Sequence, residues 1–348
     1  MSILFRTVDA WFERSSIHVP ERELPIDARW EILRRHGNFP LAYSAVSEDY
    51  LSTFGDERGM IMFAQKMGAT YALGDPMASD NDISELLPEF VGAFGAPVFV
   101  ACQSHTAKAL SRLGYSVNAL GYDSRLDLAG HSFKGGTFKR IRYATSWLAT
   151  NGMSIVEETD FEASPKALRQ MSHKWRKTRV NRREIRFLNR AFEAQVLPDV
   201  RRFFAVTETG KVVGFISFDP VFSAGRITGY LASQKRRLPE GSAYLDLAIM
   251  RAAIDIFKAE SVPSVYLGIS PVAGIGPAEI GHELGWLRRG FQAAHQSNWV
   301  NTKFFNSRGL AEYKNRFRGH RIPLYICLPP KGSRLLKVIG FLRLISLV

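Results

Sequence analysis

The pattern of hydrophobic and polar positions along the chain predicts a mixed α/β protein. Helical periodicity is found over residues 27–54, 82–94, 104–113, 137–151 and 242–258, with Gly37 ending the first helix and Ser164-Pro165 starting another long one. Strand patterns cover residues 59–64, 69–74, 97–102, 153–157, 202–207, 212–218, 226–232 and 264–269, and a strand pair is predicted over 117–128. The predicted fold class is therefore α/β (α+β), with mixed central sheets flanked by helices.

The predicted elements occur twice in the same order. Each half of the chain contains a helix, an antiparallel meander, a second helix and a further strand, although no residue-level repeat is visible. The length of 348 residues also suits two domains of average size. We therefore expect one unit over residues 1–130, a second over 131–330, and an amphipathic apolar-basic tail over 331–348.

The tail mixes apolar side chains with cations, as in Leu335, Leu336 and Phe341 beside Lys337 and Arg343. An interfacial helix on anionic lipid would have this composition. A C-terminal helix docked on the protein core would have it too, and both interpretations stay open. No run of about 18 apolar residues occurs, so no membrane-spanning helix is expected.

The net charge of +13 and the pI near 9.8 favour anionic partners such as nucleic acid, anionic lipid or phosphorylated substrates. Residues 174–190 form the densest basic segment and contain a single acid, Glu184. A solvated surface is the simpler interpretation, but the excess of cations favours an anion-binding face. The residues assigned to tRNA or anion binding are Lys174, Arg176, Lys177, Arg179, Arg182 and Arg183.

Cys102 and Cys327 both lie in apolar, strand-like segments, so buried free thiols are expected. Two cysteines suit a reducing cytoplasm and form neither a disulfide framework nor a zinc site alone. The first residues lack the apolar core of a signal peptide, so a cytoplasmic location is expected.

Several common catalytic motifs are absent from the sequence. It contains no Walker loop, no dinucleotide-binding glycine fingerprint and no Gly-x-Ser-x-Gly elbow, and His282-Glu283 lacks the second histidine of zinc proteases. We therefore predict no metal and no cofactor. The α/β meander resembles acyl-CoA N-acyltransferases of the GNAT type, but no Gly-x-Gly or Gly-x-Ala segment follows a Gln or Arg as the usual CoA loop does.

Residues 304–317 combine aromatic, amide and cationic side chains around one glycine. A turn at Gly309 would let a helix begin near Leu310, with Tyr313 and Phe317 four residues apart on one face. Taken alone, this pattern also fits an amphipathic helix with a solvated basic face.

Five segments in consistent order resemble one family. They are Ala72-Leu73-Gly74-Asp75-Pro76, residues 97–100, the helix with Arg140 and Arg142, residues 266–274, and residues 304–317, which are similar to Asn-Phe-x-Gly-Leu-x-x-Tyr-Lys-x-Lys-Phe. The chain thereby resembles the C-terminal catalytic domain (DUF2156) of the phosphatidylglycerol lysyl- and alanyl-transferases, the multiple-peptide-resistance family.

The resemblance implies a tandem pair of GNAT-like acyltransferase folds. It also implies transfer of an aminoacyl group from aminoacyl-tRNA to the hydroxyl of a phosphatidylglycerol-like lipid. The implied partners are an aminoacyl-tRNA or another acyl donor and an anionic membrane lipid, with peripheral association at the inner face of the cytoplasmic membrane. The basic segment would contact tRNA phosphates without reading sequence, and the tail would hold the site at the membrane.

The chain departs from the family pattern at two places. An Asp-Leu-Met-Arg-like strand of the family falls near Tyr230-Leu231-Ala232-Ser233, where the acid and the Arg are missing. In the terminal motif, Ser307 follows the Asn in place of an aromatic, and Arg316 replaces the second Lys. Loss of an acid weakens the case for lysine as the transferred group, and it leaves open another amino acid, another acceptor or a fatty-acyl donor.

Attack on an activated ester needs a positioned nucleophile, removal of a proton and stabilisation of an oxyanion. We assign Lys314 to neutralising a phosphate or the oxyanion, Asp246 and Glu312 to accepting a proton, and Tyr230 to relaying it. A helix-dipole or capping role is the alternative for Asp246. The substrate-binding candidates are Asn306, Arg308, Gly309, Tyr313, Arg316, Gly268, Ser270, Arg140 and Arg142.

Two other functions remain open from the sequence. One is N-acylation of an amine by an acyl carrier protein or acyl-CoA donor, which keeps the fold and changes the donor. The other is a non-enzymatic RNA- or membrane-binding protein, for which the basic helix and the tail would suffice.

Overall fold

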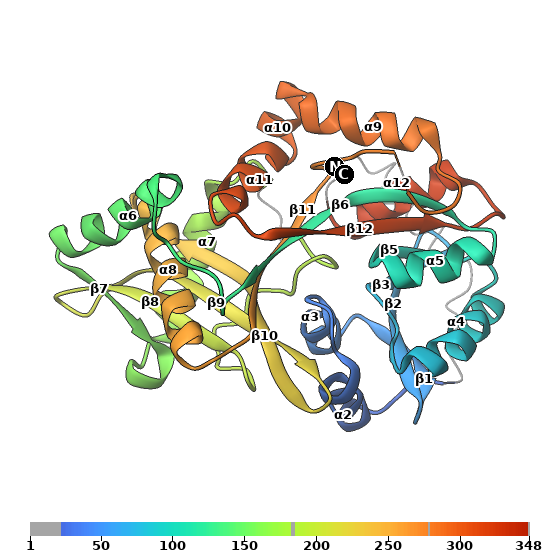
Figure 1. The fold of residues 1–348 in the computed structure, drawn as a ribbon, viewed down its shortest axis with the longest axis horizontal. Helices are drawn as coiled ribbons and strands as arrows, with labels where there is room; N and C mark the ends of the chain where they lie inside the picture. The colour runs from blue at the N-terminus through green and yellow to red at the C-terminus, as the bar shows by residue number, and fades with distance from the viewer. Residues whose placement is uncertain (1–21, 182–184, 278, 347–348) are drawn as a thin grey trace.

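One mixed β-sheet runs through the computed structural model, which describes residues 22–181, 185–277 and 279–346 (Figure 1). The first half contains α2 (Ile26–His36), α3 (Ala42–Ser47), β1 (Ser52–Asp56), β2 (Gly59–Lys66), β3 (Ala69–Leu73), β4 (Met77–Ala78), α4 (Asp80–Phe94), β5 (Val98–Cys102), α5 (Ser104–Arg112) and β6 (Ser116–Asp127).

The second half begins with the short 3-10 helix η1 (Gly136–Phe138). It continues with α6 (Lys139–Thr150), β7 (Met153–Glu157), η2 (Glu158–Asp160), α7 (Pro165–Lys177), β8 (Arg201–Thr207), β9 (Val212–Ser223), β10 (Arg226–Arg237), α8 (Tyr244–Ala259) and β11 (Ser264–Pro271). It ends with α9 (Gly285–Gln296), α10 (Asn298–Lys303), α11 (Ser307–Asn315), β12 (His320–Leu328) and α12 (Arg334–Leu344).

The same strand pairing occurs in both halves of the sheet. Neighbouring strands follow the order β1-β2-β3-β5-β12-β6-β11-β10-β9-β8-β7, and β4 pairs with β2 beside this path. In each half, the last strand of an antiparallel meander pairs in parallel with the strand after the next helix. These parallel pairs are β3 with β5 and β10 with β11. The α/β fold class and the tandem arrangement are thus confirmed.

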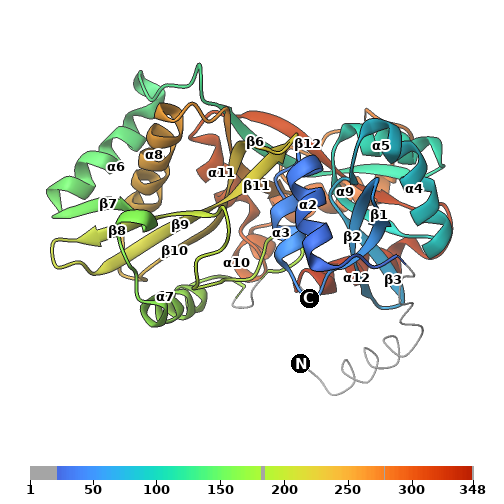
Figure 2. The same ribbon diagram turned by 90° about the horizontal axis from the view of Figure 1, so that it is seen from below.

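Helices cover both faces of the second meander. Figure 2 shows α6 and α8 on one face of β7–β10 and α7 on the other. The alternation of side chains along β8 explains this arrangement: Phe203 packs in the cluster beneath α6 and α8, whereas Phe204 packs with Leu168 of α7. Ser164 caps α7 as predicted, because its side chain accepts a hydrogen bond from the Ala167 N–H.

The last strand joins the two halves. β12 lies between β5 and β6, so a strand from the predicted second unit is inserted within the sheet of the first. Cys327 of β12 and Cys102 of β5 lie side by side as buried free thiols, with their Sγ atoms 3.6 Å apart. The unit boundary near residue 130 stays a prediction, because a continuous sheet crosses it.

Two predicted elements were wrong in detail. The segment 27–54 is not helical throughout, because α2 and α3 are followed by β1. The segment 117–128 is one long strand, β6, and not a strand pair. Leu120 bulges out of the register with β12, and Gly121 next to it has φ +150°. A Cβ atom at position 121 would collide with the Ser270 carbonyl oxygen. Glycine therefore permits the close approach of β6 to β11 that keeps β6 continuous.

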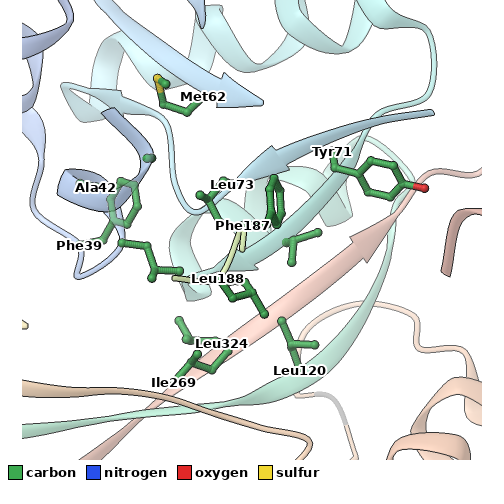
Figure 3. Close-up of a cluster of buried hydrophobic side chains, with 14 of the residues drawn as sticks. Phe39, Ala42, Met62, Tyr71, Leu73, Leu120, Phe187, Leu188, Ile269 and Leu324 are labelled. Atoms are coloured by element: carbon green, nitrogen blue, oxygen red, sulfur yellow. The ribbon is translucent and has the colours of Figure 1, made fainter. Parts of the chain in front are cut away.

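The segment after α7 anchors the two halves through the core. Figure 3 shows Phe187 and Leu188 inserted among side chains of the first half, including Leu73 and Leu120. A polar clamp follows directly. Arg190 and Asp219 form a fully buried ion pair with a shortest distance of 2.8 Å.

The tail forms α12 and docks on the first half. Val338 and Phe341 are buried in the same core cluster, and the Lys337 carbonyl oxygen accepts a hydrogen bond from the Tyr71 hydroxyl at 2.9 Å. One face of α12 is therefore docked on the protein core, as the second interpretation of the tail expected. The first turn of the helix leaves Leu335 and Leu336 exposed to solvent. Among the residues that the structure describes, every helix is too short or too polar to span a lipid bilayer.

Candidate active site

The helix α11 begins three residues earlier than predicted. Asn306 caps it by accepting a hydrogen bond from the Gly309 N–H at 2.9 Å, so Gly309 lies in the first helical turn and is not a turn of its own. A Cβ on Gly309 would come within 3.0 Å of the Asn306 side chain, which explains the glycine. Tyr313 and Phe317 lie together as predicted, with ring centres 5.6 Å apart.

Lys314 projects from α11 to the point where β10 and β11 part. These parallel strands pair only from Gly229 to Leu231 on β10. Just beyond the last pair, the Lys314 Nζ donates hydrogen bonds to the carbonyl oxygens of Gly268 at 2.7 Å and Ile269 at 2.6 Å. Gly268 has φ +81°, a conformation that strains other L-residues, and β11 shifts register against β6 there. The glycine thus turns two carbonyl groups toward the Lys314 Nζ.

Two more polar side chains are buried around this point. Asp123 of β6 and Ser270 of β11 are almost inaccessible to solvent. The described residues offer no hydrogen-bond partner to Asp123 Oδ1 or Ser270 Oγ. Such atoms cost free energy unless a ligand or water satisfies them. Burial raises the pKa of Asp123 to about 6, against the attraction of Lys314 and nearby backbone N–H groups.

A second lysine lies beside the first. Lys235, near the end of β10, places its Nζ 3.8 Å from the centre of the Tyr313 ring, and the Tyr313 hydroxyl donates to the Asp246 carbonyl oxygen at 3.2 Å. The Asp246 carboxylate lies 3.6 Å from Arg237 Nε. Burial raises the pKa of Asp246, although Lys235, Arg237 and Arg179 oppose the shift. Asp246 is thus an acid surrounded by cations in the first turn of α8.

Burial sets the charge balance of the two lysines. It lowers the pKa of Lys314 to about 7, and repulsion from Lys235 adds to this effect while Asp123 opposes it. Burial likewise lowers the pKa of Lys235 to about 8, against the attraction of Asp246. Both side chains can therefore exchange protons near neutral pH, which is the property that acid–base catalysis needs.

The other catalytic candidates lie apart from Lys314. Tyr230 stacks on Phe257 with ring centres 4.6 Å apart, and the Arg201 guanidinium lies 5.8 Å from its ring centre. Tyr230 therefore belongs to the core beneath α8, whereas its neighbour Leu231 faces Gly268. Glu312 is exposed on α11. The structure groups Lys314, Asp246 and Tyr313 and leaves Tyr230 and Glu312 outside this group.

The basic residues of α6 have structural partners. Arg142 donates to the carbonyl oxygens of Phe133 at 2.7 Å and Gly135 at 2.6 Å, which holds the segment before α6. The Arg140 guanidinium lies 5.8 Å from the centre of the Tyr244 ring. Neither residue contacts Lys314, so their assignment to substrate binding stays a prediction.

The remaining residues of the terminal motif line α11. Ser307 is buried, and its hydroxyl lies 2.9 Å from His295 Nδ1. Arg308 donates to the Asn298 side chain. Arg316 follows the last helical residue. Burial raises the pKa of Tyr313, and the positive charge of Arg316 partly counteracts this rise. The departures from the family motif thus fall on a packed residue, Ser307, and on a partly buried cation, Arg316.

The basic segment is only partly within the described residues. Lys174 and Lys177 are exposed on α7 and Arg176 is partly buried there, and Arg179 packs over Trp175 at 4.6 Å, beyond the end of the helix. Arg182 and Arg183 lie outside the described residues. Arg179 also reaches the charge cluster around Asp246, which links the predicted anion-binding face to the candidate site.

Sequence reasoning missed three residues of this site, namely Asp123, Lys235 and Arg237. Lys235 and Arg237 alternate along a strand of polar residues, a pattern that reads as a solvated face. Asp123 stands in Gly121-Tyr122-Asp123-Ser124, which reads as a turn. The continuous strand β6 and its pairing with the bulge of β11 place this acid near Lys314, and no local pattern contains that information.

The fold and this site define a protein class. Tandem α/β units with a parallel strand pair that parts at the site are the architecture of GNAT-like acyltransferases. The chain belongs to the family described as phosphatidylglycerol lysyltransferase, C-terminal, which matches residues 30–328.

Solved structures agree with this fold. L-PGS from Bacillus licheniformis is 18% identical, covers 94% of this chain and 99% of its own, and has a TM-score of 0.76. The C-terminal DUF2156 domain of a protein from Agrobacterium fabrum is also 18% identical, with coverages of 92% and 96% and a TM-score of 0.73.

One relative found by sequence similarity is a longer protein that this chain matches only in part. An uncharacterized protein of Corynebacterium glutamicum is 23% identical in an alignment of 287 positions that covers 78% of this chain. The chain spans 35% of the length of that relative. The similarity therefore concerns one part of a larger protein.

Proposed function

We propose that the chain transfers an aminoacyl group from aminoacyl-tRNA to a hydroxyl of an anionic, phosphatidylglycerol-like lipid at the inner face of the cytoplasmic membrane. Membership in the phosphatidylglycerol lysyltransferase family supports the reaction class. The donor, the acceptor and the peripheral location are part of the proposal.

The position of Lys314 carries the proposal. GNAT-type folds use the parting of their parallel strands to admit an acyl group. Here the Lys314 Nζ donates hydrogen bonds to the carbonyl oxygens of Gly268 and Ile269 at that point. A thioester-linked acyl chain, whether on CoA or on a carrier protein, would have to displace a buried lysine from two hydrogen bonds, which disfavours both of these donors. The lysine lies instead where it can act on the ester of a nucleic-acid donor and the hydroxyl of a lipid acceptor.

Surface charge supports a tRNA donor. Lys174, Lys177 and Arg179 present cations at the C-terminal end of α7, and Arg179 extends this charge to Asp246. Phosphate contacts of this kind orient a nucleic acid without reading its sequence. The exposed Leu335 and Leu336 of α12 supply the apolar part of a lipid-contacting surface, next to Lys331 and Arg334.

One observation favours a second candidate, a fatty-acyl group carried by a protein. Asp246, in the first turn of α8, is faced by Lys235, Arg237 and Arg179. This environment repels a cationic lysyl side chain and accepts an uncharged acyl chain. The acyl-carrier-protein donor therefore remains the alternative.

Both candidates can be tested in one reaction. The purified chain is incubated with phosphatidylglycerol vesicles, an amine acceptor and either mixed aminoacyl-tRNAs or acyl-loaded carrier protein, and new lipids or amides are identified by mass spectrometry. An aminoacyl lipid that disappears after ribonuclease treatment supports the proposal. Product formed only with the carrier protein overturns it in favour of the alternative.

Charge-reversal variants test the tRNA surface separately. Lys174→Glu with Lys177→Glu should weaken tRNA binding and lower the slope of log K against log[salt] by about 1.4–1.8, since each phosphate contact contributes about 0.7–0.9. Lys108→Glu with Lys134→Glu alters two exposed lysines outside α7, on α5 and before α6, and is the matched control. Equal loss in both double variants would contradict a dedicated surface on α7.

A further inference from the structure

The hydrogen bonds of Lys314 leave one position on its Nζ unassigned. A neutral amine has two N–H groups and one lone pair, whereas an ammonium has three N–H groups. The carbonyl oxygens of Gly268 and Ile269 accept two hydrogen bonds from this atom. Within the described residues no third hydrogen-bond partner is found. The third position therefore carries a lone pair in the neutral form and a spare donor in the charged form.

The surroundings of Lys314 decide which form is present. Its side chain is 4% exposed, so burial penalises the charge, and Lys235 repels it from the other strand of the parting pair. Lys235 itself is fixed over Tyr313, the residue that precedes Lys314. The charged groups near the two lysines, by element, are Asp123 (β6), Arg237 (β10), Asp246 (α8), Arg179 (after α7), Arg316 (after α11) and Arg321 (β12).

We propose that Lys235 is a positioning residue that keeps Lys314 in its proton-accepting form during acyl transfer. The inference rests on the proposed function and assigns a role to a residue that contacts neither carbonyl group. Two lysines in one desolvated region oppose each other's charge, so one of them gives up its proton more readily.

The proposed step balances without a further reactant. The acceptor hydroxyl loses its proton to the Lys314 Nζ lone pair, and its oxygen forms a bond to the ester carbonyl carbon. The resulting oxyanion collapses, and the bond from that carbon to the ribose oxygen of the donor breaks. Lys314 returns the proton to the leaving oxygen, so the enzyme regains its starting form.

The pH dependence of transfer tests this role. Lys235→Met removes the repelling charge, so the acidic limb of the kcat profile should move upward by about one pH unit, which lowers the rate about tenfold at pH 6 and leaves it unchanged near pH 9.5. Lys235→Arg keeps the charge and should retain the wild-type profile. Lys211→Met alters an exposed lysine in the β8–β9 hairpin and serves as the control.

A titration that does not depend on activity complements the kinetics. The 13Cε resonance of Lys314, identified by its absence in Lys314→Met, should titrate at higher pH in Lys235→Met than in the wild type. Lys235→Gln replaces that variant if it fails to fold. If Lys235→Met still catalyses transfer, but neither the acidic limb of its kcat profile nor the titration of the Lys314 resonance is shifted, the role of Lys235 is overturned and the proposed function is not. Absence of transfer with every donor overturns the proposed function, and the proton-accepting role with it.

Discussion

The Nζ atom of Lys314 lies 2.7 Å from the carbonyl oxygen of Gly268, a residue whose φ of +81° turns that carbonyl out of the strand. Helix α11 and strand β11 are thereby joined where the sheet pairing between β10 and β11 has ended. The lysine is a structural link and an ionisable group at the same point. Its replacement is therefore expected to affect both chemistry and stability.

Gly268→Ala tests the geometry of this link. An L-residue at this φ costs about 1–2 kcal/mol, and a Cβ would lie 3.5 Å from the Lys314 Nζ. We expect transfer to fall at least about tenfold, because small displacements of catalytic groups are costly. Gly210→Ala is the matched control, since its φ is +75° and its Cβ would meet nothing within 4 Å. Similar losses of stability, with transfer reduced only in Gly268→Ala, are the expected result in urea unfolding and kinetic assays.

The buried charge of Lys314 should make stability depend on pH. Its pKa in the folded state is about 7, below the value of 10.5 in the unfolded chain, so the unfolded chain binds more protons between these values. Stability from this group therefore rises with pH through that window. The difference in unfolding free energy between wild type and Lys314→Met should grow in favour of the wild type by about 2 kcal/mol from pH 7 to pH 9. A constant difference in urea unfolding would contradict a lowered pKa.

The buried ion pair between Arg190, after α7, and Asp219 of β9 is expected to contribute strongly to the stability of the second half. Both side chains are fully buried, so Arg190→Met or Asp219→Asn leaves an uncompensated polar group. Each should lower the unfolding free energy by about 3–5 kcal/mol. Arg35→Met breaks the exposed pair with Glu31 and should change it by less than about 0.5 kcal/mol. Equal losses of unfolding free energy in the buried-pair variants and in Arg35→Met, measured by denaturant titration, would contradict this role of the ion pair.

Leu335 and Leu336 are expected to contact lipid. The double variant Leu335→Asp, Leu336→Asp should bind phosphatidylglycerol vesicles at least about tenfold more weakly, because each leucine loses apolar burial and each aspartate adds repulsion. The thermal midpoint should change little, since both side chains are exposed. Val196→Asp alters another exposed apolar residue and provides the control for co-sedimentation. Unchanged binding of the double variant would remove α12 from the lipid surface.

Local sequence patterns predicted most of the elements but not the way in which they combine. The helix over 82–94 has apolar residues at helical spacing, and the strands over 59–64 and 69–74 are short apolar runs joined by a tight turn, which are local properties. The insertion of β12 between β5 and β6 depends on contacts far apart in sequence. The bulge at Leu120 likewise needs β12 and β11 as neighbours, so β6 was interpreted as two strands.

The candidate site was predictable only where a motif carried it. Lys314 and Tyr313 came from the terminal motif, and the structure places them against Gly268 and Asp246. Tyr230 was assigned by its position in a family strand, but alternation turns its side chain toward Phe257 and the core.

The most direct test of the account is the transfer activity of Lys314→Met. The wild type, this variant and Lys211→Met are compared at pH 8 with radiolabelled aminoacyl-tRNA and phosphatidylglycerol vesicles, and labelled lipid is counted after extraction. The account predicts that Lys314→Met folds and binds vesicles but forms labelled lipid at least about 100-fold more slowly, while Lys211→Met matches the wild type. Full transfer by a folded Lys314→Met variant would contradict it.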